Sequence, residues 1–512
     1  MYLTQGLHRS LQQTPDATMT ICGGRGRTFR EVADRVACLA AALRRLGVER
    51  NDRVGILSLN SDRYHECLLA IPWADAVVNP LNIRWSPAEI AYALNDSETA
   101  VLLVDDAFAP LVPALRAETG LRVVIHCGDG PTPDGMLSYE ELVSGAEPVD
   151  DVRRGGDELA GLFYTGGTTG FPKGVMLSHA NLLTSSLGIA AAGVFTPGGV
   201  YLHAAPMFHL ADLAAWSVHL LLGGTHVIVP AFEPRAVMAA IETHRVTDVL
   251  LIPTMIQMLV DHAALPDHDL SSLRRLAYGG SPISQAVLDR TMKALPGTDL
   301  VQAYGMTELA PLATILGPCD HTPGRLRSAG RAAPVTELRI VDGDDREVPP
   351  GTVGEIVVRG GQVMQGYWRR PEGTEAALRG GWMHTGDAAY MDDDGYVFIV
   401  DRVKDMIVSG GENVYSAEVE NALSQHPAVA ACAVIGVPDA DWGERVHAVV
   451  VLRPGAAATS DELREHTKTR IAGYKAPRSV EFVDSLPVSG AGKVLKRELR
   501  EKHWAGADRL VH

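Results

Sequence analysis

Residues 164–179, YTGGTTGFPKGVMLSH, combine several glycines and threonines with a Pro-Lys pair. In such a loop, backbone N–H groups and hydroxyls can surround phosphate oxygens, and Lys173 adds a positive charge. The common phosphate loop carries Gly-Lys-Ser/Thr at the start of a helix, whereas here Pro172 precedes the lysine and biases Phe171 away from helix. A Walker-type site is therefore disfavoured. Taken alone, the segment fits a phosphate loop and an ordinary surface loop equally well, so the choice depends on the rest of the chain.

Five further segments have residue types suited to nucleotide chemistry. In chain order they are YGMTE (304–308), TGD (385–387), DRVKD (401–405), SGGENVY (409–415) and GAGKVLKREL (490–499). Each is ambiguous alone, since a Thr-Glu pair after a strand can simply begin a helix with an acid in its first turn. The neighbouring MDDDGY (391–396) could suggest a metal site, but Asp394-Gly395 between short strands indicates a hairpin turn.

Together and in this order, the six motifs resemble the adenylate-forming superfamily, which holds acyl-CoA synthetases, nonribosomal-peptide adenylation domains and luciferases. The resemblance covers nearly the whole chain and favours the acyl-CoA synthetase branch. It implies ATP, Mg²⁺ and coenzyme A, the last as a co-substrate.

The resemblance also implies where the nucleotide binds. Glu308 is expected to hold Mg²⁺, since a hard cation prefers carboxylate and phosphate oxygens, and Thr307 to contact phosphate. Tyr304 is expected to stack on adenine, while Asp387 accepts hydrogen bonds from the ribose near Arg402. The phosphate loop and the adenine platform comprise Thr165, Gly166, Gly167, Thr168, Thr169, Lys173, Gly280, Ser281 and Pro282.

The C-terminal motifs are expected to serve catalysis and coenzyme A. Lys493 matches the lysine that neutralises both the carboxylate and the α-phosphate as they approach each other. Lys404 falls at a hinge between residues 1–403, the AMP-binding domain with the acid and ATP sites, and residues 404–512, the mobile C-terminal domain. The coenzyme A-lining loop is expected to contain Gly410, Gly411 and Glu412.

The acid pocket is expected beside His209, in the segment APMFHLADLAAW. Amino-acid adenylators typically follow this position with an Asp that holds the substrate ammonium, but Leu210 stands here. Asp212 lies nearby in the sequence, although three residues on it can face elsewhere. The remaining predicted pocket residues are Tyr278, Gly279, Gly280, Ala303 and Met306. This apolar set favours an alkyl acid, such as a medium- or long-chain fatty acid, or an aryl acid over an amino acid.

The elements that must position these residues follow from the hydrophobic pattern. From about residue 53 to residue 308, short apolar runs such as RVGIL and THVIVP alternate with helix-like stretches such as SQAVLDRTMKAL. This predicts a large α/β domain with buried strands. From residue 337, short strands with turn signals predict a small β-rich subdomain. The last hundred or so residues predict a small α+β domain, with helices over 418–425 and 460–469 and a strand over 445–453.

Composition limits the partners of the 512-residue chain. Its net charge of −16, without any Lys/Arg-rich run, argues against nucleic acid and anionic membranes. The six cysteines are scattered without metal-binding spacing, and no apolar run is long enough for an integral membrane segment. We expect a reduced, cytoplasmic protein that binds small molecules; its oligomeric state is left open, a homodimer included.

The sequence thus predicts an AMP-forming acid–thiol ligase: carboxylic acid and MgATP give an acyl-adenylate and pyrophosphate, and coenzyme A then gives acyl-CoA and AMP. The alternative is a stand-alone adenylation enzyme that loads an acyl group onto a carrier protein. A luciferase-like oxidation has no separate signature, and a non-enzymatic nucleotide-binding protein is disfavoured by the intact Lys173, Glu308, Asp387 and Lys493. The choice of acid, the pathway and the use of a carrier protein in place of coenzyme A stay open.

Overall fold

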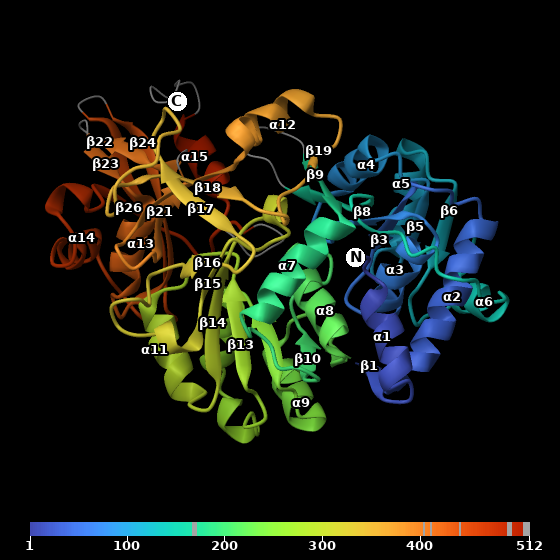
Figure 1. Ribbon diagram of the computed structural model, residues 1–512. Helices are drawn as coiled ribbons and strands as arrows, with labels where there is room; N and C mark the ends of the chain where they lie inside the picture. The colour runs from blue at the N-terminus through green and yellow to red at the C-terminus, as the bar shows by residue number, and fades with distance from the viewer. Residues whose placement is uncertain (166–171, 403–404, 410–411, 440–441, 489–493, 505–512) are drawn as a thin grey trace.

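The computed structural model (Figure 1) describes the chain except for residues 166–171, 403–404, 410–411, 440–441, 489–493 and 505–512. Its strands form four sheets in the described part of the chain. None of the helices in that part is both long and apolar enough to cross a lipid bilayer.

The first sheet has the strand order β16-β15-β14-β13-β12-β10-β11-β1-β2. Neighbours from β14 to β1 pair in parallel, and the strands at both ends pair antiparallel. The strands are β1 (Thr18–Cys22), β2 (Arg25–Thr28), β10 (Val200–His203), β11 (Thr225–Ile228), β12 (Asp248–Leu251), β13 (Arg275–Gly279), β14 (Asp299–Tyr304), β15 (Thr314–Leu316) and β16 (Arg331–Ala332).

The second sheet has the order β19-β9-β8-β4-β3-β5-β6-β7. It brings β19, which is distant in sequence, to the edge of β9. Its strands are β3 (Arg53–Leu57), β4 (Val77–Pro80), β5 (Val101–Val104), β6 (Val123–His126), β7 (Leu137–Ser138), β8 (Leu159–Thr165), β9 (Lys173–Ser178) and β19 (Gly366–Tyr367).

Two smaller sheets follow. The third is antiparallel, with β17 (Glu337–Val341), β18 (Gly354–Arg359), β20 (Met383–Met391) and β21 (Val397–Arg402). The fourth contains β22 (Ile407–Ser409), β23 (Glu412–Val414), β24 (Val429–Asp439), β25 (Gly443–Leu452) and β26 (Ser479–Phe482).

The helices cover the sheets. Those of the larger, N-terminal part are α1 (Gln5–Gln13), α2 (Phe29–Arg45), α3 (Asp62–Trp73), α4 (Pro87–Asp96), α5 (Val112–Glu118), α6 (Tyr139–Ser144), α7 (His179–Ala191), α8 (Leu210–Leu222), α9 (Pro234–His244), α10 (Pro253–Val260), α11 (Gln285–Ala294) and α12 (Pro371–Ala377). The C-terminal part carries α13 (Ser416–Ser424), α14 (Ser460–Lys468) and α15 (Lys496–Trp504). Figure 1 shows α7 and α8 between the first two sheets.

Local sequence explains how α7 begins directly after β9. Ser178 ends the strand and accepts a hydrogen bond from the Asn181 backbone N–H, while the Asn181 side chain accepts from the Ser178 backbone N–H. This reciprocal pair satisfies two N–H groups that the first helical turn leaves without partners. The same Asn181 amide donates to the carbonyls of Gly361 and Val363, so the helix start also holds the segment that leads into β19.

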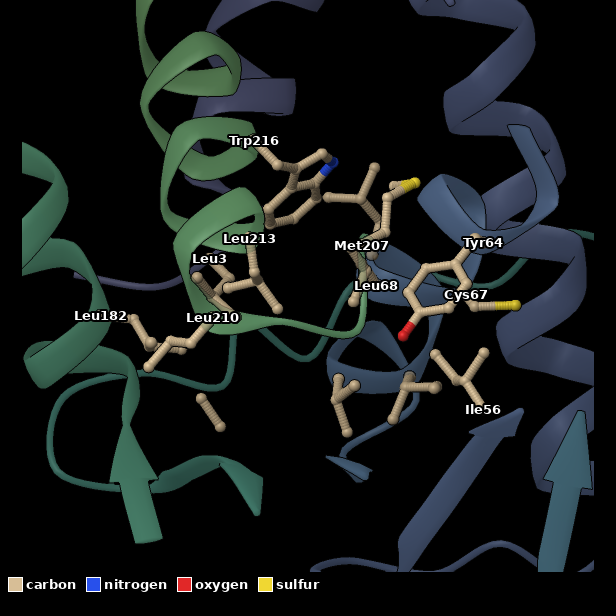
Figure 2. Close-up of a cluster of buried hydrophobic side chains, with 14 of the residues drawn as sticks. Leu3, Ile56, Tyr64, Cys67, Leu68, Leu182, Met207, Leu210, Leu213 and Trp216 are labelled. Carbon is tan, nitrogen blue, oxygen red and sulfur yellow. The ribbon is translucent and has the colours of Figure 1, made fainter. Parts of the chain in front are cut away.

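The core beside α8 fixes the predicted pocket segment. Figure 2 shows Leu210 of α8 beside Leu182 of α7, while Leu213 and Trp216 of α8 lie on the side of Leu68 and Tyr64 from α3. All are at most 3% exposed, and burial of each such side chain is worth roughly 1.5–3 kcal/mol. Because Leu210 directly follows His209, this packing fixes the place where His209 enters the helix.

Most predicted elements are confirmed. The run RVGIL forms β3 at the predicted residues 53–57, and the stretch SQAVLDRTMKAL contains α11. Asp394-Gly395 lies in the turn between β20 and β21, as the hairpin signal predicts. The β-rich subdomain and the α+β arrangement after residue 405 are also present. The division into domains at residues 403 and 404 stays a prediction, because both residues lie outside the described part.

Candidate active site

The predicted adenine and acid residues meet at one edge of the first sheet. Strands β10, β12, β13 and β14 are neighbours and parallel, so their carboxyl ends lie at the same edge. From these ends continue three predicted segments, residues 204–209, 279–282 and 304–308. The carboxyl edge of a parallel sheet is the usual place for ligands in α/β folds.

Close backbone approach at this edge requires glycine. A Cβ on Gly279 would lie 2.1 Å from the carbonyl oxygen of Ala303, its register partner on β14. Gly280 has a φ of +77°, a conformation that other residues rarely adopt. A Cβ on Gly305 would lie 1.6 Å from the Pro311 carbonyl oxygen. The glycines therefore let both loops run close to neighbouring backbone; Ser281 beside them is partly exposed and Pro282 is exposed.

Glu308 is the residue predicted to hold Mg²⁺. It lies in a 3₁₀ turn, η3 (Thr307–Leu309), and is 6% exposed. One carboxylate oxygen, Oε1, accepts a hydrogen bond of 2.9 Å from the Tyr367 hydroxyl. Burial and the Glu308 carboxylate raise the pKa of Tyr367, so the phenol stays a donor. The Glu308 carbonyl also accepts from the Met364 N–H at 2.9 Å, which ties the turn to the chain leading into β19.

Lys173 joins this group from the second sheet. Its Nζ lies 5.1 Å from the centre of the Tyr367 ring, within the range of a cation–π contact. Thr165 and Lys173 are register partners on β8 and β9, so they flank the two ends of the predicted phosphate loop. The loop residues Gly166, Gly167, Thr168 and Thr169 lie outside the described residues. Lys173 and Glu308, which are 135 positions apart in the sequence, thus both contact Tyr367.

Asp387 forms the predicted ribose end. It is 8% exposed and accepts a hydrogen bond of 2.7 Å at Oδ2 from the Tyr304 hydroxyl. Its backbone N–H donates to the Thr385 hydroxyl at 3.1 Å. Asp387 and Arg402 are register partners on β20 and β21, although the Arg402 side chain is outside the described part. The structure thereby brings Tyr304 and Asp387 together, whereas stacking of Tyr304 on adenine stays a prediction.

His209 caps α8 at the pocket segment. Its Nδ1 accepts a hydrogen bond of 3.2 Å from the Ala211 backbone N–H, which leaves the ring partly exposed. Ala303 and Met306 are also partly exposed on and after β14. Tyr278, by contrast, is 1% exposed, and its hydroxyl lies 3.0 Å from His321 Nε2. Its backbone is at the pocket edge, but its ring packs in the core, and its pocket role stays a prediction.

Asp212 faces away from this edge. It is 0% exposed and accepts from the Tyr201 hydroxyl at 2.8 Å, and its other oxygen lies 2.7 Å from His203 Nδ1. The carboxylate is therefore committed to the core between α8 and β10. It does not supply the ammonium partner that an amino-acid substrate requires.

The C-terminal candidates fall mainly outside the described residues. Lys404, Gly410, Gly411 and Lys493 all lie there, and only the backbone of Glu412 is described, at the start of β23. Their roles stay predictions.

Comparisons with known proteins identify the family of the chain. Family models described as AMP-binding enzyme and AMP-binding enzyme C-terminal domain match residues 7–368 and 418–493. The chain belongs to the AMP-binding enzyme family. It is 44% identical to a feruloyl-CoA synthase from an Amycolatopsis species over 495 residues, which cover 96% of this chain and 97% of that protein. The adenylate-forming family predicted from the motifs is thereby confirmed.

Two further relatives bear on the reaction. The chain is 36% identical to the fatty acid–[acyl-carrier-protein] ligase ScoC of Streptomyces coeruleorubidus, over 98% of this chain and 96% of that one. Its fold matches the crystal structure of the anthranilate CoA ligase AuaEII in complex with anthranoyl-AMP, with a TM-score of 0.92, 28% identity, and coverage of 99% and 98%. The protein is thus an AMP-forming acid–thiol ligase that uses ATP and coenzyme A through an acyl-adenylate, as the sequence predicts.

Tyr367 is the residue that sequence reasoning missed. Its GYW context at 366–368 carries no charge or glycine-rich pattern, and its contact with Glu308 becomes visible only when β19 pairs with β9. A tyrosine within a short segment that follows the TE motif by about sixty residues is the only sequence signal.

Proposed function

We propose that this ligase converts an aryl carboxylic acid with an uncharged side chain, of the hydroxycinnamic type, into its coenzyme A thioester. The observation that carries the proposal is the 44% identity to a feruloyl-CoA synthase along almost the whole of both chains. The pocket-edge residues support it, since His209, Ala303 and Met306 offer no acid, and the nearby Asp212 is held in the core. A buried ammonium without a partner would be costly.

Pyrophosphate release tests this proposal. The panel compares hydroxycinnamic acids, straight-chain fatty acids of medium and long chain length, and α-amino acids, each with ATP and coenzyme A. We expect the hydroxycinnamic acids to give the highest kcat/KM and the amino acids no turnover. A preference for fatty acids of at least tenfold would overturn the aryl assignment while leaving the ligase chemistry intact.

A second candidate function is loading of an acyl group onto a carrier protein. The similarity to ScoC along nearly the whole of both chains favours it. The test supplies the preformed acyl-adenylate with either coenzyme A or a phosphopantetheinylated carrier protein and measures thioester formation. Faster transfer to the carrier protein would favour this function over the coenzyme A ligase.

We propose that Glu308 holds the Mg²⁺ that accompanies ATP. The residues fit this role, because the Tyr367 hydrogen bond orients a largely buried carboxylate in the middle of η3, next to Thr307. Bound there, Mg²⁺ would neutralise phosphate charge. Lys173 supplies a second positive charge at the same end, and Asp387 fixes the ribose through its acceptor oxygens. Thr165 and the loop that follows it then surround the departing pyrophosphate.

The two lobes are proposed to act in turn. Lys493 is needed only while the carboxylate and the α-phosphate approach each other, whereas the segment around Gly411 serves the thiol. Lys493→Ala should therefore reduce acyl-adenylate formation by roughly a hundred- to a thousandfold and spare thioester formation from supplied acyl-adenylate. Gly411→Leu should do the reverse. Equal damage to both half-reactions in both variants, after folding is checked by circular dichroism, would contradict the alternation of lobes about Lys404.

A further inference from the structure

A group of two histidines and one glutamate, none of which has been assigned a role above, lies in the C-terminal part. His447 is on β25, Glu481 on β26 and His503 on α15. Strands β25 and β26 are parallel, with His447 opposite Ser479, so Glu481 lies two residues along on the same face of the sheet. On α15, Leu499 and His503 are four residues apart and share a face. Leu499 packs into the cluster that contains Val449, so this face is the one turned to the sheet.

The side-chain atoms of the group converge. His447 Nε2 lies 3.6 Å from Glu481 Oε2, and His503 Nε2 lies 3.8 Å from the same oxygen. All three ligand atoms lie within 4.8 Å of one another. A tetrahedral Zn²⁺ about 2.0–2.1 Å from each ligand would place the ligand atoms roughly 3.3 Å apart. The two distances to the carboxylate are a few tenths of an ångström longer than this, and the two imidazole nitrogens, within 4.8 Å of each other, would approach each other on binding.

His447 is oriented for a cation. Its side chain is 7% exposed, and its Nδ1 lies 2.7 Å from the Ser479 hydroxyl. The other ring nitrogen, Nε2, is buried and has no hydrogen-bond partner among the described residues. With Nδ1–H donated to Ser479, Nε2 directs a lone pair toward the Glu481 carboxylate, which is also an acceptor. Histidine ligands of metals commonly have this arrangement, in which the second ring nitrogen donates to a neighbouring oxygen that fixes the ring.

We propose that His447, Glu481 and His503 bind one divalent transition-metal ion of the zinc type, with water in the fourth position. Two imidazole nitrogens and one carboxylate suit Zn²⁺ or Co²⁺ and do not suit Mg²⁺ or Ca²⁺, which prefer oxygen ligands. The ion is separate from the Mg²⁺ of the nucleotide, and its ligands come from two strands and the last described helix.

Such an ion would hold α15 against strands β25 and β26. The indole N–H of Trp504, next to His503, already donates to the Gly436 carbonyl at 2.9 Å, so the end of the helix is held at one further point. Helix α15 begins three residues after Lys493. The metal would therefore limit how far the chain beyond the proposed catalytic lysine can separate from its own lobe.

Metal retention by the untagged full-length chain tests the site. Cys319, an exposed cysteine, is first replaced by Ser to remove a competing thiol. The chain is stripped with a chelator, equilibrated with Zn²⁺ alone, separated by gel filtration and analysed for zinc per chain. We expect one equivalent, together with a rise in melting temperature and, with Co²⁺, the visible absorption of tetrahedral cobalt. Mg²⁺ should not compete.

Substitutions decide whether this triad is the site. His503→Ala and Glu481→Gln should each weaken Zn²⁺ binding by at least tenfold and abolish the cobalt absorption. Both residues are partly exposed, with side-chain exposures of 29% and 40%, so the changes leave the core intact. His426→Ala is the matched control. His426 pairs with His466 in the same lobe at 4.9 Å between ring centres, and its loss should not change binding. No zinc uptake, or equal uptake by the control and the triad variants, would overturn the proposal.

Discussion

Tyrosine–carboxylate hydrogen bonds occur in two regions of the molecule, the predicted site and the core. At the site edge, Glu308 and Asp387 each accept a hydrogen bond from a tyrosine, Tyr367 at 2.9 Å and Tyr304 at 2.7 Å. In the core, Asp212 accepts one from Tyr201 at 2.8 Å. Exposure separates the two regions, since the site acids are 6% and 8% exposed and Asp212 is 0% exposed.

The difference lies in what stands next to each pair. Asp212 continues into a chain of buried rings, through His203 Nδ1 and then from His203 Nε2 to His226 Nδ1 at 2.9 Å. The site acids instead lie in a turn after β14 and on β20, among the residues predicted to bind ATP. We therefore expect a tyrosine–carboxylate pair to be structural where buried side chains enclose it, and chemical where it lies among the residues predicted to bind ATP. The contrast predicts loss of stability in one region and loss of activity in the other.

The largest effect is expected from Asp212→Ala. The change leaves the Tyr201 hydroxyl and the His203 N–H buried without an acceptor, and each such group costs about 1–3 kcal/mol, so the free energy of unfolding should fall by about 2–6 kcal/mol. Differential scanning fluorimetry and urea unfolding measure it. The Asp212→Asn variant is the control, and it should lose less. The amide still accepts from Tyr201, and its NH₂ can donate to His203 once the ring hydrogens shift along the chain. An unchanged melting temperature in Asp212→Ala would contradict the structural role.

Glu308→Gln should show the opposite pattern. Removal of one carboxylate charge from the proposed metal end should reduce adenylation by at least about a hundredfold, while the Gln oxygen can still accept from Tyr367 and preserve stability. Pyrophosphate release at several Mg²⁺ concentrations measures the effect. Glu347→Gln, an exposed acid with a side-chain exposure of 53%, is the control and should behave as the wild type. If Glu308→Gln lost stability and kept its activity per folded molecule, the two regions would not differ as argued.

The sequence reveals the site acids better than the core acid, and the reason is physical. Thr307-Glu308 and Asp387 stand in short motifs that contain a glycine, Gly305 or Gly386, because the backbone there adopts close or unusual conformations at fixed positions. Asp212 stands in an apolar helix with no local signal, and its partners Tyr201 and His203 are on a different element. Strands such as β3 follow from their apolar runs alone, since buried parallel strands are continuously hydrophobic.

Contacts between distant segments were not predictable. The pairing of β19 with β9 joins Tyr367 to Glu308 and Lys173, but two residues of strand give no periodicity to recognise. The burial of the Tyr278 ring in the core was also not predicted, because a Tyr-Gly pair at the end of a strand does not indicate toward which face of the sheet the ring points. The adenine and acid segments were predictable as a set only through their order along the chain.

Acid should destabilise the core region specifically. Burial lowers the pKa of His65 to about 3, against an ordinary value of 6.5, and its Nδ1 accepts from the Trp216 indole N–H at 2.9 Å. Between roughly pH 6.5 and 3, the unfolded chain binds a proton at His65 that the folded chain does not, so stability falls as the pH falls through this window. The loss approaches about 1.4 kcal/mol per pH unit.

His65→Asn tests this contribution. The Asn oxygen can accept from Trp216 near the position of Nδ1 but does not titrate, so the loss of stability between pH 7 and pH 5 should shrink by about 2 kcal/mol. Urea unfolding at both pH values measures the difference. An equal loss in the variant and in the wild type would show that His65 carries no part of the acid sensitivity.

The smallest effects should distinguish the two site acids from each other. Tyr367→Phe removes the hydroxyl that orients Glu308, and Tyr304→Phe removes the one that orients Asp387. A single hydrogen bond to a charged group contributes about 1.5–3 kcal/mol, and these bonds only orient the acids, so each variant should lose at least about tenfold in kcat/KM, the lower end of that range. If Glu308 serves the metal, Tyr367→Phe should need more Mg²⁺ for half-maximal rate at an unchanged KM for ATP. If Asp387 serves the ribose, Tyr304→Phe should raise the KM for ATP at an unchanged Mg²⁺ requirement.

Tyr474→Phe, at an exposed tyrosine, controls for the substitution itself. The same shift in both variants would mean that the two tyrosines support one common site, and the separate roles of Glu308 and Asp387 would have to be abandoned.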